Sequence, residues 1–249
     1  MSDRFKDKVA LVTGASSGIG RAIAKHFAAE GAQVVITGRR EPELKAIADE
    51  IGGAALAVRA DSSSLGDLDS LFATVTARYG RLDIVVPNAG VGWLTPLGQI
   101  TEEDYEAIFG VNVKGAIFTV QKALPLLGAG ASVILNGSAL SAVGTPAFSV
   151  YAATKATLRS LVRNWAVDLK GTGIRVNIVS PGPVATPALL GLGQPGQEQQ
   201  TLEAFSKLVP LGRVAHPDEI AKIFAFVASE DASFMHGAEV FVDGGKAQV

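Results

Sequence analysis

The chain has no cysteine, which excludes a disulfide framework, a thiolate metal site and a cysteine nucleophile. Its three histidines, His26, His216 and His236, show no metal-ligand spacing, so we expect no metal site. With 22 Lys and Arg against 24 Asp and Glu, the net charge is -2, and no basic field is present to attract a nucleic acid. The N-terminal segment MSDRFKDK is polar, and no run of about 20 apolar residues could span a bilayer. These absences predict a soluble, cytoplasmic protein without a nucleic-acid or membrane partner.

Charged residues are also sparse, at 18%, whereas 48% of the residues are hydrophobic, and this balance argues against disorder. Short apolar runs alternate with helix-like segments along the whole chain. The runs span residues 9–13, 33–37, 54–58, 82–86, 131–135, 174–179 and 238–242. Nearly continuous apolar runs are typical of strands buried on both faces, and strand–helix alternation implies parallel pairing. We predict a single doubly wound α/β domain of the Rossmann type over residues 1–249, with a mostly parallel sheet flanked by helices.

Two polar segments are typical of helix starts. Thr101-Glu102-Glu103-Asp104 resembles a capping box and opens a long helical stretch expected over residues 101–127. His216-Pro217-Asp218-Glu219 places proline in a first helical turn. We interpret the acidic cluster at 102–104 as structural, with a binding site as the less favoured alternative.

A glycine-rich turn follows the first predicted strand. It reads Thr13-Gly14-Ala15-Ser16-Ser17-Gly18-Ile19-Gly20 and leads into a helix. Glycine allows a sharp turn and the close approach of a pyrophosphate, and the helix N-terminus offers free N–H groups to the phosphates. The spacing G-x-x-x-G-x-G differs from the common dinucleotide fingerprint and from a P-loop. The turn therefore predicts a phosphate site, although a plain tight turn stays possible.

The second predicted strand ends at Gly38, followed by Arg39 and Arg40. In dinucleotide-binding folds an acidic residue about 20 positions after the glycine turn takes the ribose 2′-OH of NAD, whereas arginine accommodates the 2′-phosphate of NADP. Here two guanidinium groups stand in that place and no carboxylate does. We predict NADP(H) as the cofactor, the alternative being two solvated surface arginines.

Tyr151 and Lys155 are four residues apart, which places them on one face of a helix. A nearby ammonium favours the phenolate, so it lowers the phenol pKa from about 10 and makes a general acid or base. Such a pair alone is often an ordinary helical pair. Ser138 adds weight, because it follows a predicted strand at the sheet edge where open α/β folds bind ligands.

Two asparagines are further candidate site residues. Asn112 is a polar residue in an otherwise apolar helical stretch, and it could equally satisfy a local backbone group. Asn88-Ala89-Gly90 follows the strand over 82–86, again at a strand's carboxyl end.

Taken in order, these motifs resemble the short-chain dehydrogenase/reductase family over essentially the whole chain. The matching residues are 13–20, Asn88-Ala89-Gly90, Asn112, Ser138, Tyr151 with Lys155, Pro181-Gly182 with Thr186, and the closing Phe241-Val242-Asp243-Gly244-Gly245. The resemblance implies a seven-stranded parallel sheet, an NAD(P) cofactor and commonly a homotetramer. This sequence departs from the family at Gly137, where family members often carry serine, and we expect little consequence from this difference.

The resemblance also implies a role for each matched residue. Tyr151 would donate the proton in ketone reduction, Lys155 would lower the pKa of Tyr151 and contact the nicotinamide ribose, Ser138 would bind the carbonyl, and Asn112 would help to hold a proton relay. Cofactor contacts would come from Gly14, Ser16, Ser17, Gly18, Ile19, Gly20, Gly38, Arg39, Arg40, Asp61 beside the adenine, Asn88, Ala89, Gly90, and Pro181, Gly182, Val184 and Thr186 around the carboxamide.

We therefore predict an NADP-dependent short-chain alcohol dehydrogenase or carbonyl reductase that interconverts a ketone or aldehyde and a secondary alcohol. Mostly apolar loops, 91–94, 139–140, 147–148 and a lid at about 187–208, would form the substrate wall or serve ordinary loop packing. A 3-oxoacyl-[acyl-carrier-protein] reductase is the alternative, although the lid has no basic residue before Lys207. A cofactor-binding regulator and a lyase or epimerase on the same fold stay open.

Overall fold

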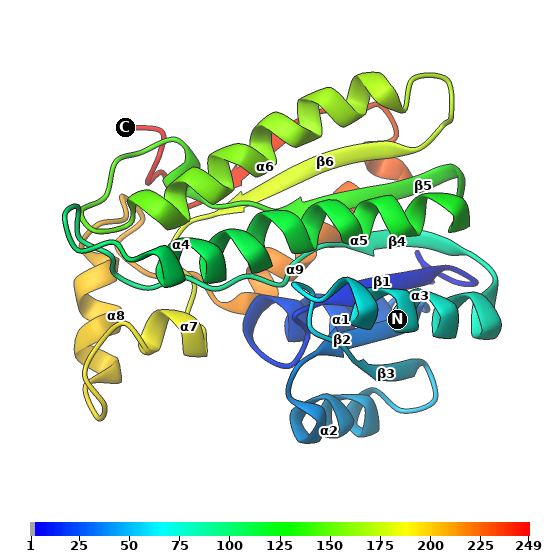
Figure 1. Ribbon diagram of the computed structural model, residues 1–249, viewed down its shortest axis with the longest axis horizontal. Helices are drawn as coiled ribbons and strands as arrows, with labels where there is room; N and C mark the ends of the chain where they lie inside the picture. Colours follow the sequence, from blue (N-terminus) through cyan, green and yellow to red (C-terminus); the bar gives the residue numbers. More distant parts are fainter. Residues whose placement is uncertain (1–2) are drawn as a thin grey trace.

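A computed structural model describes residues 3–249; the first two residues of the predicted domain and of its polar N-terminal segment lie outside the described range. Seven strands form one sheet in the order β3-β2-β1-β4-β5-β6-β7, and every neighbouring pair is parallel (Figure 1). The strands are β1 (Val9–Thr13), β2 (Gln33–Gly38), β3 (Ala55–Arg59), β4 (Leu82–Val86), β5 (Leu127–Asn136), β6 (Arg175–Pro181) and β7 (Glu239–Val242). The predicted single α/β domain with a seven-stranded sheet is confirmed.

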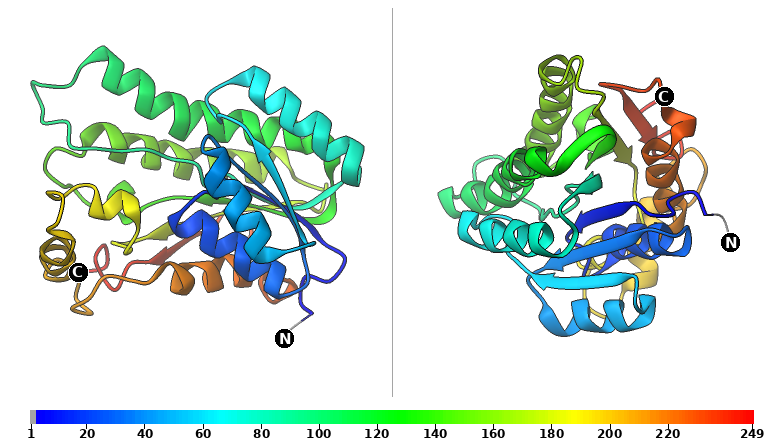
Figure 2. Two further views of the ribbon diagram at one scale, coloured as in Figure 1. Left: turned by 90° about the horizontal axis from the view of Figure 1, so that it is seen from below. Right: turned by 90° about the vertical axis from the view of Figure 1, so that its right-hand side faces the viewer.

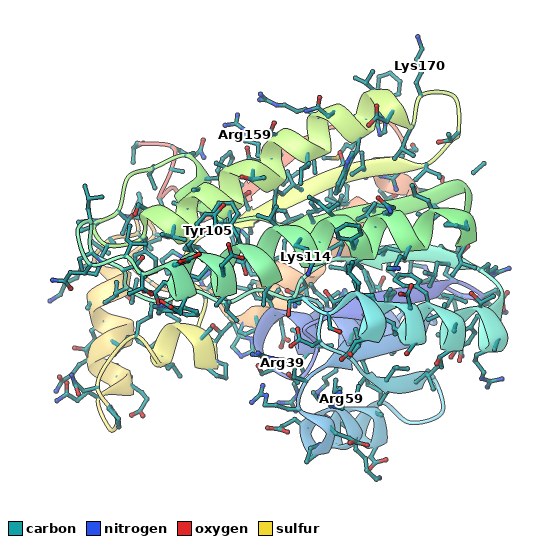
Figure 3. All side chains as sticks on the ribbon, viewed as in Figure 1. Arg39, Arg59, Tyr105, Lys114, Arg159 and Lys170 are labelled. Atoms are coloured by element: carbon teal, nitrogen blue, oxygen red, sulfur yellow. The ribbon has the colours of Figure 1, made fainter. Side chains whose placement is uncertain are left out.

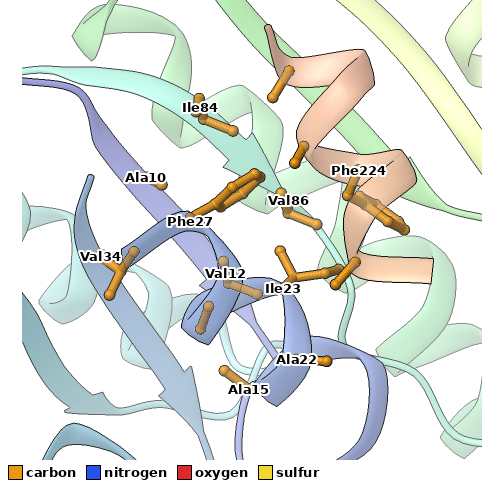
Figure 4. Packing of buried hydrophobic residues seen from close by; sticks show 14 of the residues in the cluster. Ala10, Val12, Ala15, Ala22, Ile23, Phe27, Val34, Ile84, Val86 and Phe224 are labelled. Atoms are coloured by element: carbon orange, nitrogen blue, oxygen red, sulfur yellow. The ribbon is translucent and has the colours of Figure 1, made fainter. Parts of the chain in front are cut away.

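Helices cover both faces of the sheet (Figure 2). The helices are α1 (Gly18–Ala29), α2 (Glu41–Ile51), α3 (Leu65–Tyr79), α4 (Glu102–Phe109), α5 (Gly115–Ala123), α6 (Ser149–Asp168), α7 (Pro187–Leu190), α8 (Glu198–Ser206) and α9 (Pro217–Ala228). One core lies between the sheet and α1, α2 and α9, where Phe27 and Ile23 pack near Phe224 (Figure 4). A second core lies between the opposite face and α3, α5 and α6. Burial on both faces explains why the central strands lack polar alternation.

The predicted helix starts are confirmed. Thr101 caps α4 through its hydroxyl while the Asp104 carboxylate accepts from the Thr101 N–H, and His216 with Glu219 forms the corresponding box at α9. The helical stretch expected over 101–127 is interrupted, however. Between α4 and α5 the chain forms a π-helical turn, Gly110–Lys114, and β5 already begins at Leu127. Such a turn widens the helix by one residue and is frequent at functional sites.

The sheet order reverses between β1 and β4, because β2 and β3 lie on one side of β1 and the later strands on the other. A crevice at the carboxyl ends of the strands is expected at such a point. The segment between β6 and α9 carries α7 and α8 and stands apart from the sheet (Figure 1). Its two ends are joined, since the Ala185 N–H donates to the Ala215 carbonyl at 2.9 Å and the Ala215 N–H donates to the Pro183 carbonyl at 2.9 Å.

No helix within residues 3–249 is long and apolar enough to cross a membrane.

Candidate active site

A cavity of about 490 Å³ lies where the carboxyl ends of the strands meet the lid segment. All of the residues predicted to bind the cofactor line it, together with Ser138, Tyr151 and Lys155: Gly14, Ser16, Ser17, Gly18, Ile19, Gly20, Gly38, Arg39, Arg40, Asp61, Asn88, Ala89, Gly90, Pro181, Gly182, Val184 and Thr186. Asn112 is buried behind the cavity wall. Residues from both halves of the chain thus converge on one cavity.

The glycine turn between β1 and α1 is shaped by backbone contacts. Gly14 and Gly18 have positive φ values of 64° and 56°. A Cβ on Gly14 would lie 2.7 Å from the Ala89 Cα, and a Cβ on Gly20 would lie 2.5 Å from the Gly14 carbonyl oxygen. Ser17, the residue before α1, makes no side-chain hydrogen bond to the first turn. The helix therefore presents uncapped N–H groups at the cavity, as an anion site requires.

Arg40 lies across this turn. Its Nη2 donates to Ser16 Oγ at 3.1 Å and to Ser17 Oγ at 3.0 Å, and its Nη1 lies 3.3 Å from Glu43 Oε1. Arg39 lines the same end of the cavity, near the start of α2 (Figure 3). Two guanidinium groups and two hydroxyls therefore surround the site where the sequence predicts a 2′-phosphate.

Asn88 braces the turn from behind. Its amide donates to the carbonyls of Thr13 and Gly14 at 2.9 and 3.2 Å, and its Oδ1 accepts from the Asn136 amide at 2.9 Å. The Thr13 hydroxyl in turn accepts from the backbone N–H groups of Asn88 and Ala89. The side chain of Asn88 thus joins the ends of β1, β4 and β5, and this brace fixes the walls of the cavity.

Other predicted cofactor residues have local partners as well. The Asp61 Oδ1 accepts from the Ser63 N–H and hydroxyl at 2.9 and 2.7 Å. The Thr186 hydroxyl accepts from the Leu189 N–H at 3.2 Å and caps α7. Thr186 also faces the glycine turn, because a Cβ on Gly18 would lie 3.1 Å from its methyl carbon. Lid and turn therefore approach each other across the cleft.

Tyr151, Lys155 and Ser138 meet on the opposite wall. The Lys155 Nζ lies 5.5 Å from the centre of the Tyr151 ring while donating to the Asn136 carbonyl at 2.8 Å. Burial raises the pKa of Tyr151, and the neighbouring Ser138 hydroxyl lowers it in part. Burial also lowers the pKa of Lys155 to about 8. The protein alone therefore does not show the lowered Tyr151 pKa that the sequence argument expects, and the phenol stays protonated near pH 7.

Asn112 lies in the π-helical turn. Its Oδ1 accepts from the Val91 N–H at 2.8 Å, and its amide donates to the Val91 carbonyl at 2.9 Å and to the Thr154 hydroxyl at 3.1 Å. The backbone group that it satisfies is 21 residues away, not local as the alternative reading of the sequence supposed. Asn112 thus fixes the loop after β4 against α6.

The substrate side of the cavity is apolar. Its wall comes from residues of the predicted loops and of the predicted lid at 187–208: Val91, Gly92, Ala139, Leu140, Phe148, Pro187, Ala188, Leu189, Leu192, Phe205 and Leu208. Trp93 and Leu94 do not line it, and the Trp93 indole donates to Asp104 at 2.6 Å. A Cβ on Gly92 would overlap the Tyr151 ring. The loop after β4 therefore packs tightly beside the phenol.

Sequence reasoning missed Asn136. It lines the cavity, receives the Lys155 ammonium on its carbonyl, and has a buried Oδ1 without a hydrogen-bond partner among the described residues. Its position as the last residue of β5, two residues before Ser138, was a usable signal. Through its carbonyl, Asn136 fixes the Lys155 ammonium at the edge of the cavity.

Comparisons with known proteins agree with this geometry. The family model described as enoyl-(acyl carrier protein) reductase matches residues 14–247. The chain is 46% identical to "Oxidoreductase asL5" of Sarocladium schorii, covering 99% of this chain and 98% of that protein. The chain belongs to the short-chain dehydrogenase/reductase family. It is an oxidoreductase of that family, whose fold uses a nicotinamide cofactor.

Two further members of the family are informative. "Elsinochrome reductase 1" of Elsinoe fawcettii is 35% identical, covering 98% of this chain and 96% of that protein. A solved 3-ketoacyl-(acyl-carrier-protein) reductase from Brucella melitensis, complexed with NADH, superposes with a TM-score of 0.91 at 33% identity, covering 98% of this chain and 99% of that chain. The family thus includes reductases that are named for different substrates.

Proposed function

We propose that this member of the family is an NADP(H)-dependent carbonyl reductase, which interconverts an apolar ketone or aldehyde and a secondary alcohol. One observation carries the proposal: Ser138, Tyr151 and Lys155 line the same cavity as the glycine turn and the arginine pair. A proton donor and a phosphate site in one cavity are what carbonyl reduction by a nicotinamide needs.

The residues present fit such a cofactor. The turn at 14–20 lines the cavity with glycine at positions 14, 18 and 20, and no side chain caps the first turn of α1, so its N–H groups can receive a phosphate. The pyrophosphate would lie on the turn at 14–20, and the 2′-phosphate between Arg39, Arg40 and the two serines. Asp61 would lie beside the adenine, and residues 181–186 around the carboxamide. When bound, the reduced cofactor supplies the hydride for the carbonyl carbon.

The side chains of the protein supply the rest of the chemistry. Ser138 donates a hydrogen bond to the substrate oxygen and stabilises the negative charge that develops there. Tyr151 transfers its phenolic proton to that oxygen, and its raised pKa keeps the proton in place until it is needed. Lys155 is protonated below pH 8 and stabilises the phenolate that remains. Asn112 holds Val91, and with it the wall beside Tyr151.

The substrate side favours an apolar carbonyl compound. Leu189, Leu192 and Phe205 of the lid line the cavity together with Phe148 and Leu140. The similarity to a protein named as an elsinochrome reductase supports reduction of an organic compound as the reaction. A hydrophobic wall of this kind binds through the area that it buries.

A second candidate is a 3-oxoacyl-[acyl-carrier-protein] reductase. The superposition on such an enzyme favours it. The lid argues against it, because residues 187–206 contain Glu198 and Glu203 and no lysine or arginine. An acidic carrier protein needs a basic docking surface, so the free apolar ketone is the preferred substrate.

The homotetramer that the resemblance implies and the cytoplasmic location expected from the sequence belong to the same proposal. Sedimentation equilibrium of the purified protein tests the first, with a mass four times that of the 25.7 kDa chain as the expected result.

The reaction is tested by the loss of NADPH absorbance with a panel of apolar ketones and a 3-oxoacyl carrier protein. Wild type is expected to consume NADPH with a ketone, and Tyr151→Phe to lose turnover while it retains NADPH binding. Wild-type kcat in Tyr151→Phe refutes the assignment. Binding of NADPH without net consumption indicates a regulator, a lyase or an epimerase instead.

A further inference from the structure

We propose that Glu239 is a positioning residue, which holds the turn that carries Ser138 in its reactive place. Glu239 is the first residue of β7 and lies outside the cavity lining. The proposal rests on the proposed function, because it takes Ser138 as the hydroxyl that binds the carbonyl.

The carboxylate of Glu239 has three partners from three elements. Its Oε1 accepts from the Ser180 hydroxyl of β6 at 2.8 Å and from the Ser141 hydroxyl at 3.1 Å. Its Oε2 lies 2.6 Å from Nε of Arg159, which is on α6 (Figure 3), as an ion pair without hydrogen-bond alignment. Only 8% of the Glu239 side chain is exposed, so these partners replace almost all of its water.

Each partner is adjacent to the site chemistry. Ser141 ends the short 3-10 turn Ala139–Ser141, and Ser138 caps the start of that turn by accepting from the Leu140 N–H at 3.2 Å. Arg159 lies two helical turns after Tyr151 on α6. One buried carboxylate therefore joins the Ser138 turn to the helix of Tyr151 and Lys155.

The same group also restrains the residue before Ser138. A Cβ on Gly137 would overlap the Ser180 Oγ and would lie 2.9 Å from Ile178 Cδ1. The Ser180 hydroxyl, held by Glu239, thus fills the space where a side chain at position 137 would stand. A side chain at 137 would have to displace Ser180 and Ile178, so the departure from the family pattern at Gly137 has a structural consequence. The Ser138 segment is thus fixed on both sides, at Gly137 and at Ser141.

Burying a carboxylate costs desolvation free energy, and an apolar side chain of similar volume often gives a protein of equal stability. A glutamate at 239 is therefore explained by the single arrangement of the Ser138 turn that it specifies. Loss of the carboxylate removes the shared partner of the Ser141 and Ser180 hydroxyls and of the Arg159 guanidinium. The turn that carries Ser138 can then shift. A displacement of about 1 Å at a reacting group can cost up to about a hundredfold in rate.

The test compares Glu239→Ala and Glu239→Gln with Glu230→Gln, a matched change of an exposed glutamate after α9. In Glu239→Ala, kcat for the ketone is expected to fall about tenfold, with the NADPH Kd within about twofold of wild type. Glu239→Gln keeps an acceptor for both serines and is expected to recover most of kcat. Thermal unfolding identifies the folded fraction, to which kcat is normalised.

A second variant keeps the proposal falsifiable if Glu239→Ala does not fold. Ser141→Ala should lower kcat severalfold by itself while the NADPH Kd stays within about twofold of wild type, because it removes the contact between the Ser138 turn and Glu239. A kcat in Ser141→Ala equal to that of wild type, or a kcat in Glu239→Ala equal to that of Glu230→Gln, overturns the proposal. Ser138→Ala is measured first: if it retains wild-type kcat, the proposed function has failed, and not the role of Glu239 alone.

Discussion

Cofactor preference gives the sharpest prediction, through the single substitution Arg40→Gln. Arg40 spans the glycine turn with hydrogen bonds to Ser16 and Ser17, and it lines the cavity where the 2′-phosphate would lie. A hydrogen bond between charged groups contributes about 1.5–3 kcal/mol. The Arg40 side chain is 51% exposed and also pairs with Glu43, so the lower end applies. About 1.5 kcal/mol corresponds to roughly a tenfold loss.

The assay is kcat/KM for NADPH and for NADH with one ketone under the same conditions. The ratio of the two values is expected to fall about tenfold in Arg40→Gln, with the NADH value nearly unchanged. Arg59→Gln is the matched control, because Arg59 ends the neighbouring strand β3, is 56% exposed and does not line the cavity. An equal fall for both cofactors, or a wild-type preference for NADH, refutes the assignment of Arg40 to a phosphate.

Three further predictions concern stability and packing. The pKa of Lys155 is about 8 in the folded protein and 10.5 in the free group, so between these pH values the unfolded state binds more protons than the folded state. From pH 8 to 10.5 the free energy of unfolding of wild type should therefore rise by about 3 kcal/mol relative to that of Lys155→Met. Parallel pH curves of the two proteins in urea denaturation would contradict this. Gly20→Ala places a Cβ 2.5 Å from the Gly14 carbonyl oxygen, so the NADPH Kd measured by fluorescence titration should rise at least tenfold. Gly66→Ala is the control, because its Cβ meets nothing within 4 Å, and its Kd should equal that of wild type. Asn112→Ala removes both hydrogen bonds to the part-buried backbone of Val91, and it should lower the free energy of unfolding by about 2 kcal/mol in urea denaturation and remove most of kcat. A loss below about 0.5 kcal/mol would exclude the brace.

Local signals in the sequence predicted the sheet and the outline of the cavity. Apolar runs between glycine turns identify buried strands, and the TEED and HPDE segments cap helices whatever surrounds them. Parallel strands bring their carboxyl ends to one edge, so residues that follow strands, such as Ser138 and Asn88, converge there.

Long-range contacts were beyond the reach of those signals. Nothing near Asn112 indicates that the helix widens there to meet Val91, because the partner is 21 residues away. The link between Glu239 and Ser141 spans 98 residues and exists only in the folded chain. The pKa of Tyr151 likewise depends on burial by the whole fold, which a four-residue spacing does not encode.

The paired backbone bonds between Ala185 and Ala215 and between Ala215 and Pro183 make the intervening stretch a self-closed insertion. Its entry and exit points are anchored to each other, so its interior can change in length or composition while the neighbouring strand and helix keep their places. Exchanging residues 187–206 between relatives, with Leu211 left on the Gly244 carbonyl and Arg213 on Glu219, is therefore a modular way to redirect which molecules this scaffold accepts.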